Sequence, residues 1–179
     1  EISGSDMFIY TGKAMEPWAE TVISSINTEC SIVDVSKNIE LIELDDFISK
    51  YSILDEEEHE HNEAEHSYEY DGHIWMDPKN AIIMLDTICD ELVKLDPKNK
   101  DYYEKNANEY KLQMNKLDKE IEEALRENNI DTLVVGGEFA YAYFCKRYDL
   151  KVLSCYTACG EGAEPSISRI KDVIDYINN

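Results

Sequence analysis

Residues 96–127 read DPKNKDYYEKNANEYKLQMNKLDKEIEEALRE. Apolar side chains recur along this stretch in steps of three or four, at Tyr103, Ala107, Tyr110, Met114, Leu117, Ile121 and Leu125. That spacing predicts one amphipathic helix, with Asp96 as a natural N-cap and Pro97 in the first turn. A helix over 98–127 is about 45 Å long, which exceeds the usual globular helix. Such a helix is typical of a coiled coil or bundle, or of a spine joining two lobes.

Short apolar segments separated by turn signals lie on both sides of this helix. Before it we expect strands at 7–10 and 31–35, a weaker extended piece at 41–44, and helices at 17–27 and from Pro78. After it we expect strands at 132–135 and 150–155, and helices at 139–148 and from Ser166. The first helix turns Trp18, Val22, Ile23 and Ile26 inward, and the last turns Ile167, Ile170, Val173, Ile174 and Ile177 inward.

Strands that alternate with helices imply parallel sheets. The sequence therefore predicts an α/β fold of two small parallel-sheet lobes joined by a long rigid helix. The N-terminal lobe spans 1–97, the linking helix 98–127 and the C-terminal lobe 128–179.

The charge balance restricts the partners of the chain. Its 179 residues hold 17 Lys and Arg against 39 Asp and Glu, for a net charge of -22. This acidity argues against nucleic acid and anionic membrane surfaces, and it suits cations. No apolar run approaches the ~18 residues of a transmembrane helix, and we expect no signal peptide within residues 1–179.

The five cysteines form no C-x-x-C pair. Cys30, Cys89 and Cys145 lie in apolar surroundings that are typical of buried thiols. Cys155 and Cys159 either pair or stay free, and the sequence does not decide between these states.

All four histidines fall in residues 55–78, DEEEHEHNEAEHSYEYDGHIWMDP. Imidazole nitrogen and carboxylate oxygen are donors that zinc and its first-row neighbours prefer. The H-x-H-x4-H spacing of His59, His61 and His66 is not a closed structural zinc motif. We therefore expect residues 55–70 to be a weak, mobile acceptor loop, and a solvated acidic loop is the alternative.

His73 differs, because it lies where the charge run stops, in D-G-H-I-W-M-D-P. Gly72 supplies a turn before it. Asp77 and Pro78 are a natural N-cap and first helical residue after it. This setting predicts a metal ligand in a fixed position, and a structural histidine is the alternative.

Glu138 directly follows the predicted strand 132–135 and the Gly136-Gly137 turn. Ligands of open α/β sheets bind beyond the carboxyl ends of strands. Glu138 is therefore a candidate metal ligand facing His73 across a cleft. The alternative is a surface glutamate at a helix N-terminus, favoured there by the helix dipole.

Four motifs follow one another in the order found in a known family. They are GKAMEPW at 12–18, DGHIWMDP at 71–78, Glu138 with YFCKRY at 143–148, and AEPS at 163–166. Over nearly its whole length the chain resembles the ZnuA/TroA-type solute-binding proteins of zinc and manganese ABC importers. The most specific parts of this resemblance are the His73 motif and the neighbouring histidine-rich loop.

The resemblance implies metal held between two lobes by ligands from both. His73 matches a family histidine ligand, and Glu138 falls where zinc members place a histidine and manganese members a glutamate. The family's early histidine and late acidic ligand have no counterpart here, so the chain resembles the middle of the fold with both ends missing. A full site needs about four ligands. We therefore expect weak, loop-borne zinc binding and no cleft binding of native affinity.

The same resemblance implies an extracytoplasmic protein, lipid-anchored in full length, that delivers Zn²⁺ to an ABC transporter permease. Mn²⁺ is the alternative metal, since Glu138 adds an oxygen donor. A zinc hydrolase is disfavoured because the chain has no H-E-x-x-H. A metal-binding surface adhesin is another alternative. Exposed apolar edges left by missing ends favour dimerisation.

Overall fold

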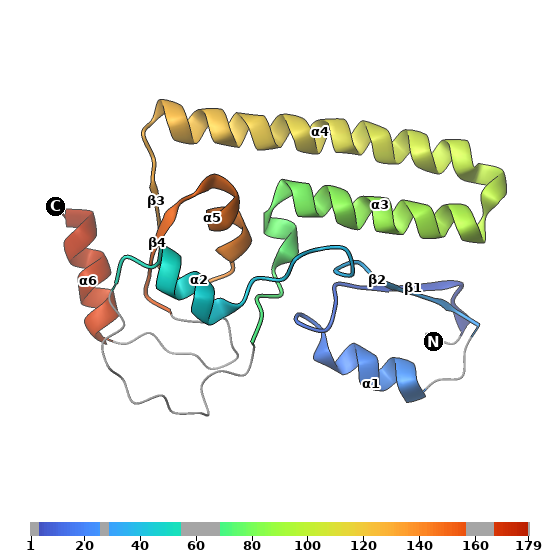
Figure 1. Ribbon diagram of the computed structural model, residues 1–179, viewed down its shortest axis with the longest axis horizontal. Helices are drawn as coiled ribbons and strands as arrows, with labels where there is room; N and C mark the ends of the chain where they lie inside the picture. Colours follow the sequence, from blue (N-terminus) through green and yellow to red (C-terminus); the bar gives the residue numbers. More distant parts are fainter. Residues whose placement is uncertain (1–3, 26–28, 55–68, 157–166, 179) are drawn as a thin grey trace.

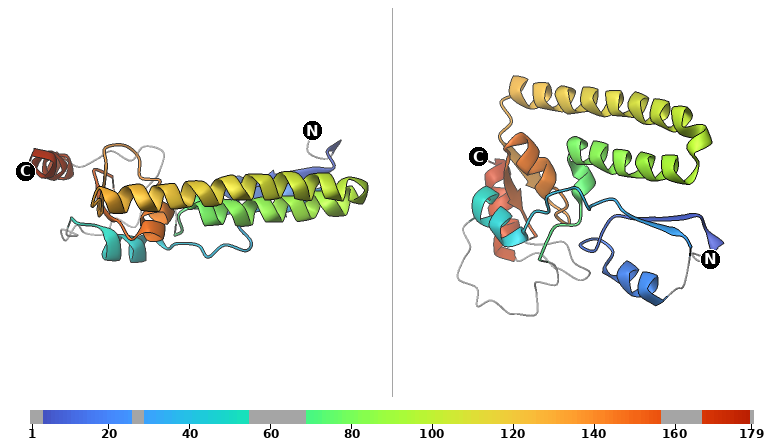
Figure 2. Two further views of the ribbon diagram at one scale, coloured as in Figure 1. Left: turned by 90° about the horizontal axis from the view of Figure 1, so that it is seen from above. Right: turned by 45° about the vertical axis from the view of Figure 1, so that its right-hand side comes forward.

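The computed structural model describes residues 4–25, 29–54, 69–156 and 167–178. Two long helices run side by side along the molecule, and a two-stranded parallel sheet lies toward either end (Figure 1). β1 and α6 stand at opposite ends in each of the other views (Figure 2). The predicted fold of two small parallel sheets and a long helix is confirmed.

The N-terminal sheet pairs β1 (Met7–Tyr10) with β2 (Ser31–Asp34) in parallel. α1 (Pro17–Ser25) forms the crossover between them and packs against β1, with the rings of Phe8 and Trp18 in edge contact. The sheet lies between α1 and α3 (Figure 1). Trp18 is 51% exposed while Ala19 is fully buried, so the prediction that Trp18 turns inward is wrong. In the described residues the sheet beside α1 has two strands, and it leaves about half of Trp18 uncovered.

The helical pair consists of α3 (Pro78–Leu95) and α4 (Lys100–Glu127), each preceded by a short 3-10 turn, η2 (Ile74–Met76) and η3 (Pro97–Asn99). Asp77 caps α3 as predicted, because its Oδ1 accepts the N–H of Lys79 at 2.7 Å. α4 packs along α3, so its buried stripe is narrow. Tyr110 and Leu117 of the predicted stripe are therefore exposed, and the polar Asp118 is buried.

The C-terminal sheet pairs β3 (Thr132–Val135) with β4 (Lys151–Ser154) in parallel, through α5 (Ala142–Tyr148). α5 begins three residues later than predicted, and Phe139 is buried in the segment before it. The backbone turns into the left-handed region at Asn129, two residues after α4, and at Asp149, directly after α5. The predicted end of the long helix at residue 127 is confirmed.

A helix that was not predicted, α2 (Leu44–Tyr51), packs against α5. Ser52 forms a parallel bridge with Val152, and the N–H of Ile53 donates to the Val152 carbonyl at 2.9 Å. Leu44, Phe47, Ile48 and Tyr51 have helical spacing, and Asp45 and Asp46 suit a first turn. Residues 41–44 were expected to be extended, and the helix begins at Leu44 instead.

The main core therefore combines residues that precede the long helix in the sequence with residues that follow it. The rings of Phe47 and Phe139 stack with centroids 5.6 Å apart. Other buried members are Ile39, Ile42, Tyr51, Ile74, Val135, Ala142, Tyr143, Cys145, Leu150 and Val152. Segment 39–54 thus packs against the second sheet, while the lobe boundaries 1–97, 98–127 and 128–179 stay a prediction.

The last helix, α6 (Ile167–Asn178), differs from expectation. Val173 is buried, but Ile167, Ile174 and Ile177 are 87%, 51% and 64% exposed, and Ile170 is at the margin with 36%. α6 contacts β4, so one residue of the predicted apolar face is covered. Ser166, its predicted cap, lies outside the described residues.

Two of the predicted buried thiols, Cys89 and Cys145, are buried, and Cys30 is partly exposed. Cys155 is also buried, whereas Cys159 lies outside the described residues. Within the described ranges, no helix has both the length and the apolar composition needed to cross a bilayer.

Candidate metal site

His73 lies between the isolated bridge at Tyr70 and the turn η2, and its side chain is 17% exposed. Asp71 Oδ1 accepts the backbone N–H of His73 at 2.9 Å. The same oxygen lies 2.6 Å from His73 Nδ1. One carboxylate oxygen therefore fixes both the backbone and the ring of this histidine. The predicted fixed position of His73 follows from this pair as well as from the helix start that comes after it.

Asp71 is itself buried, with 4% of its side chain exposed. Its N–H donates to the Ile42 carbonyl at 2.9 Å, and its carbonyl accepts from the Tyr143 hydroxyl at 3.0 Å. Its second carboxylate oxygen, Oδ2, is buried without a hydrogen-bond partner. A buried carboxylate oxygen in this state is costly. The side-chain hydrogen bonds of Asp71 in the described residues are thus concentrated on His73.

Gly72 is required for a different reason than the predicted turn. A Cβ on Gly72 would lie 2.9 Å from the Cα of Met15, so the two backbones approach too closely for a side chain. The glycine with a positive φ among the described residues is Gly12, at 117°. Gly72 therefore lets the GKAMEPW loop pack directly beside His73.

Trp75 borders the other side of the imidazole. The two rings meet edge to face with centroids 5.4 Å apart. Trp75 is 39% exposed, and the chain has one other tryptophan, Trp18. An indole at this distance can report on changes at His73.

Glu138 is exposed, in the segment between β3 and α5, after a bend at Gly136 and Gly137. It is not on a helix, so a dipole at a helix N-terminus does not account for it. The predicted facing of Glu138 and His73 across a cleft stays a prediction. In the described part of the chain, no three or more His, Cys, Asp or Glu side chains come together to hold a metal. His59, His61 and His66 of the predicted acceptor loop lie outside that part.

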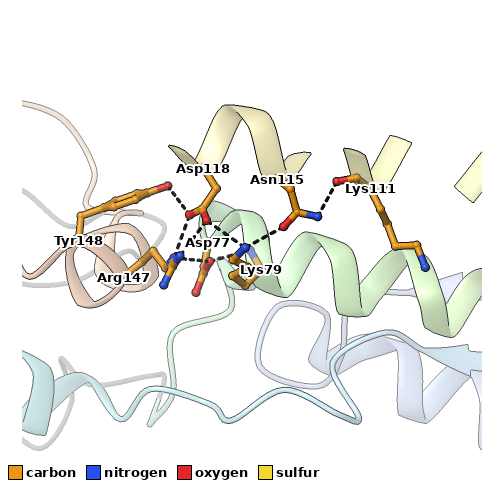
Figure 3. A network of polar contacts seen from close by, with 7 residues as sticks. All are labelled: Asp77, Lys79, Lys111, Asn115, Asp118, Arg147 and Tyr148. Atoms are coloured by element: carbon orange, nitrogen blue, oxygen red, sulfur yellow. Dashed lines mark hydrogen bonds and ion pairs between the residues drawn. The ribbon is translucent and has the colours of Figure 1, made fainter. Parts of the chain in front are cut away.

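A second polar cluster lies at the start of α3, five residues after His73 (Figure 3). Asp118 of α4 accepts from Arg147 of α5 in a bidentate pair, at 2.9 Å from Nε and 2.8 Å from Nη2. Lys79 Nζ lies 3.0 Å from the same carboxylate, and the Tyr148 hydroxyl donates to it at 3.1 Å. We call these four residues the Asp118 cluster.

The Asp118 cluster joins three helices at one buried charge. The Arg147 hydrogen bonds are the main reason that the pKa of Asp118 falls to about 2, and they raise the pKa of Arg147 in turn. Burial raises the pKa of Tyr148, so its hydroxyl stays a donor at neutral pH. The cluster connects α5, which follows Glu138, to the helix that follows His73.

Sequence reasoning singled out His73 and missed Asp71, Tyr143 and Asp118. Asp71 carries a signal, since a carboxylate two residues before a histidine can bond both its N–H and its ring. Asp118 carries a weaker signal, as an acidic residue between Met114 and Ile121 on an apolar stripe. Tyr143 lies 72 residues from Asp71 along the chain, so only the fold brings them together.

Comparison with known proteins places these observations in a family. Residues 1–179 match the model of the ZnuA family, described as "Zinc-uptake complex component A periplasmic". The high-affinity zinc uptake system protein ZnuA of Bacillus subtilis is 33% identical over 154 residues, covering 84% of this chain and 45% of the relative. The zinc-binding lipoprotein AdcA of Streptococcus pneumoniae is 27% identical over 179 residues, covering 99% of this chain and 34% of the relative.

Solved structures give the same result. The laminin-binding protein Lmb of Streptococcus agalactiae, described as a bifunctional protein with adhesin and metal transporting activity, aligns with a TM-score of 0.76 at 26% identity. The alignment covers 98% of this chain and 58% of Lmb. The chain therefore spans roughly a third to three fifths of the length of these relatives.

Proposed function

This chain belongs to the ZnuA family of periplasmic zinc-uptake components, and we propose that its protein captures a divalent transition metal for an ABC importer. Zn²⁺ is the favoured metal. The protein acts by binding and release and performs no chemistry on its cargo. The match of the family model over residues 1–179 supports the proposal.

The observation that carries the proposal is the environment of His73. Metal-bound histidines usually donate their second ring N–H to a carboxylate or carbonyl, which fixes the ring for coordination. Asp71 provides such a carboxylate at 2.6 Å, on a backbone held by Ile42 and Tyr143. A structural histidine would need no buried carboxylate with one oxygen unpartnered.

We assign His73 and Glu138 as ligands of the cleft, one from each side of the long helix. His59, His61 and His66 supply a weaker acceptor beside it, which raises the local metal concentration. Two ligands are fewer than the about four of a complete site, so this chain alone binds zinc weakly.

The choice of metal rests on two opposing features. The histidine-rich tract favours zinc, and the zinc-uptake relatives support that preference. Glu138 adds a harder oxygen donor, which favours Mn²⁺ as the alternative. The proposed partners are the metal ion and an ABC transporter permease. The proposed location is outside the cytoplasmic membrane, with a lipid anchor on the full-length protein, as the lipoprotein relative suggests.

Adhesion is a second candidate role for the same protein. The specific support is the similarity to Lmb, whose description combines adhesin and metal transporting activity. Binding of the chain to immobilised laminin tests this role. All samples have the same ionic strength, and excess free laminin serves as the competitor in the control.

Zinc titration followed by Trp75 fluorescence tests the main proposal. A Trp18→Phe background leaves Trp75 as the one tryptophan, 5.4 Å from His73. Zinc should change its emission, and His73→Asn should abolish the change. The matched control is His59→Asn/His61→Asn/His66→Asn, which should remove most of the calorimetric heat but keep the Trp75 response. Trp75 emission that does not change with zinc, or that changes equally in the parent and in His73→Asn, would contradict the proposal.

A further inference from the structure

We propose that Asp71 holds His73 in the Nδ1–H tautomer, so that Nε2 is the atom presented to a metal, and that Tyr143 holds Asp71 in place. The inference rests on the proposed function for its purpose, but not for its geometry. It assigns positioning roles to two residues that do not touch the metal.

The tautomer follows from the hydrogen bonds of a single oxygen. Asp71 Oδ1 lies 2.9 Å from the His73 backbone nitrogen, which is a donor, so this oxygen acts as an acceptor. The same oxygen lies 2.6 Å from Nδ1. An ionised carboxylate has no hydrogen to give, so Nδ1 carries the proton. The lone pair of the neutral ring is then on Nε2, which is the atom available for coordination.

The burial of Asp71 makes this preference strong. Its side chain is 4% exposed, and its Oδ2 has no hydrogen-bond partner. His73 therefore provides the two N–H groups that stabilise this carboxylate in the described structure. Electrostatic interactions are stronger in a buried setting than in water. A cation on Nε2 would make the ring a better donor to Asp71, so metal binding and burial of this charge favour each other.

Tyr143 extends the arrangement across the long helix. Its hydroxyl accepts from the Ile42 N–H at 3.1 Å and donates to the Asp71 carbonyl at 3.0 Å. Tyr143 is 3% exposed and lies on α5, which follows the loop that carries Glu138. α5, which follows the loop with the proposed ligand Glu138, thus sets the position of Asp71. Asp71 in turn orients the other proposed ligand, His73. Tyr148 is a natural control, because its hydroxyl bonds Asp118 and not Asp71.

Nitrogen NMR of His73 tests the tautomer without any metal. The His59→Asn/His61→Asn/His66→Asn background leaves one histidine, and its spectra are taken in the alkaline range where its nitrogen shifts no longer change with pH. Long-range proton–nitrogen correlations then distinguish the tautomers. We expect Nδ1–H in this background, and a shift to the Nε2–H form that predominates in free histidine in Asp71→Ala. An Nε2–H ring before the Asp71 change, or Nδ1–H after it, would overturn the inference.

Tyr143→Phe keeps the buried ring and removes both hydroxyl bonds, so it tests the second half even where Asp71→Ala fails to fold. We expect a measurable population of Nε2–H in Tyr143→Phe and none in Tyr148→Phe. Equal tautomer ratios in the two variants would overturn the role of Tyr143.

Zinc titration with Trp75 emission adds the functional reading, in the same background with Trp18→Phe. Asp71→Ala should weaken zinc binding at His73 about 10- to 100-fold. Unchanged affinity would overturn the positioning role. Absence of any zinc response before the Asp71 change would instead count against the proposed function, and the NMR result would still decide the tautomer.

Discussion

Asp118 is the residue whose burial and charge make the strongest prediction about stability. It is 3% exposed and accepts hydrogen bonds or ion pairs from Arg147, Lys79 and Tyr148. Breaking a buried pair by removing one partner typically costs 3–5 kcal/mol. Arg147 is about one third exposed, so part of its charge is recovered by water and the cost lies at the low end.

We predict that Asp118→Asn lowers the free energy of unfolding by about 3 kcal/mol at pH 7, and that this difference shrinks in acid. Arg147 lowers the folded-state pKa of Asp118 to about 2, below its unfolded value of 3.8. The stabilisation linked to this pKa shift is therefore present above pH ~4 and is lost as pH falls toward 2. It accounts for about 2 kcal/mol of the predicted difference between the two proteins. Denaturant unfolding of both proteins between pH 7 and 2.5 measures it.

Two features sharpen this test. Burial raises the folded-state pKa of Asp77, so protonation of Asp77 in acid stabilises the folded chain. Both the parent and Asp118→Asn contain Asp77, so comparing them largely removes this effect. Glu123→Gln, an exposed change on the same helix, is the matched control for the loss of one carboxylate. A gap between Asp118→Asn and the parent that stays constant down to pH 2.5 would contradict the prediction.

At the scale of single residues, sequence selected His73 as a metal ligand, which stays a prediction, and it overlooked the bonds to Asp71 that hold this residue. The Asp77-Pro78 helix start is a local signal, and it is visible in eight residues of sequence. Asp71 and Tyr143 act through contacts that depend on the packing of α5 against segment 39–54. Asp118 is 29 residues from Arg147 along the chain, so their pairing also depends on the fold.

Helix caps show how similar sequence signals differ in the structure. Asp77-Pro78 and Asp96-Pro97 look alike, and both precede helices. Asp77 bonds the N–H of Lys79, whereas α4 begins after a 3-10 turn, with Asn99 at its N-cap position and no side-chain cap bond there. The same dipeptide therefore starts an α-helix directly in one case and through a short turn in the other.

We predict that Asp77→Ala destabilises the chain by about 1 kcal/mol, the usual cost of losing a side-chain cap. Asn99→Ala should cost clearly less, because Asn99 caps no helical N–H and bonds the side chain of Asp96 instead. Thermal and denaturant unfolding of the two variants at neutral pH measure the difference. Equal losses would show that the bond from Lys79 to Asp77 contributes nothing.

Elements with a clear period were predicted, and elements defined by their neighbours were not. β1, β2, β3, β4 and the helical pair follow from apolar runs and helical spacing. α2 is eight residues long, and a short apolar run does not distinguish helix from strand. Its helical state is stabilised by Phe47 and Tyr51 against the core around Phe139. The apolar face of α6 has the expected period, but β4 covers only part of it.

The whole molecule combines a strong negative charge with an exposed apolar face at one end. The net charge is -22, and copies of the chain repel one another at low salt. α6 stands at the end of the molecule (Figure 1), with Ile167, Ile174 and Ile177 largely exposed. A second copy of the chain offers the same apolar face, so two α6 helices can cover each other. Repulsion and apolar contact therefore oppose each other, and salt weakens only the repulsion.

We predict that the chain self-associates, and that dimer formation increases with ionic strength. The screening length falls from about 14 Å at 0.05 M salt to about 4 Å at 0.5 M. The charge repulsion is then largely removed, while apolar contact is retained. Sedimentation velocity across this range measures the dimer fraction. Ile174→Lys should abolish the salt-induced dimer, whereas Leu112→Lys, an equal change on the exposed face of α4, should leave it intact. A dimer that dissociates as salt rises would point to ion pairs and contradict an α6 interface.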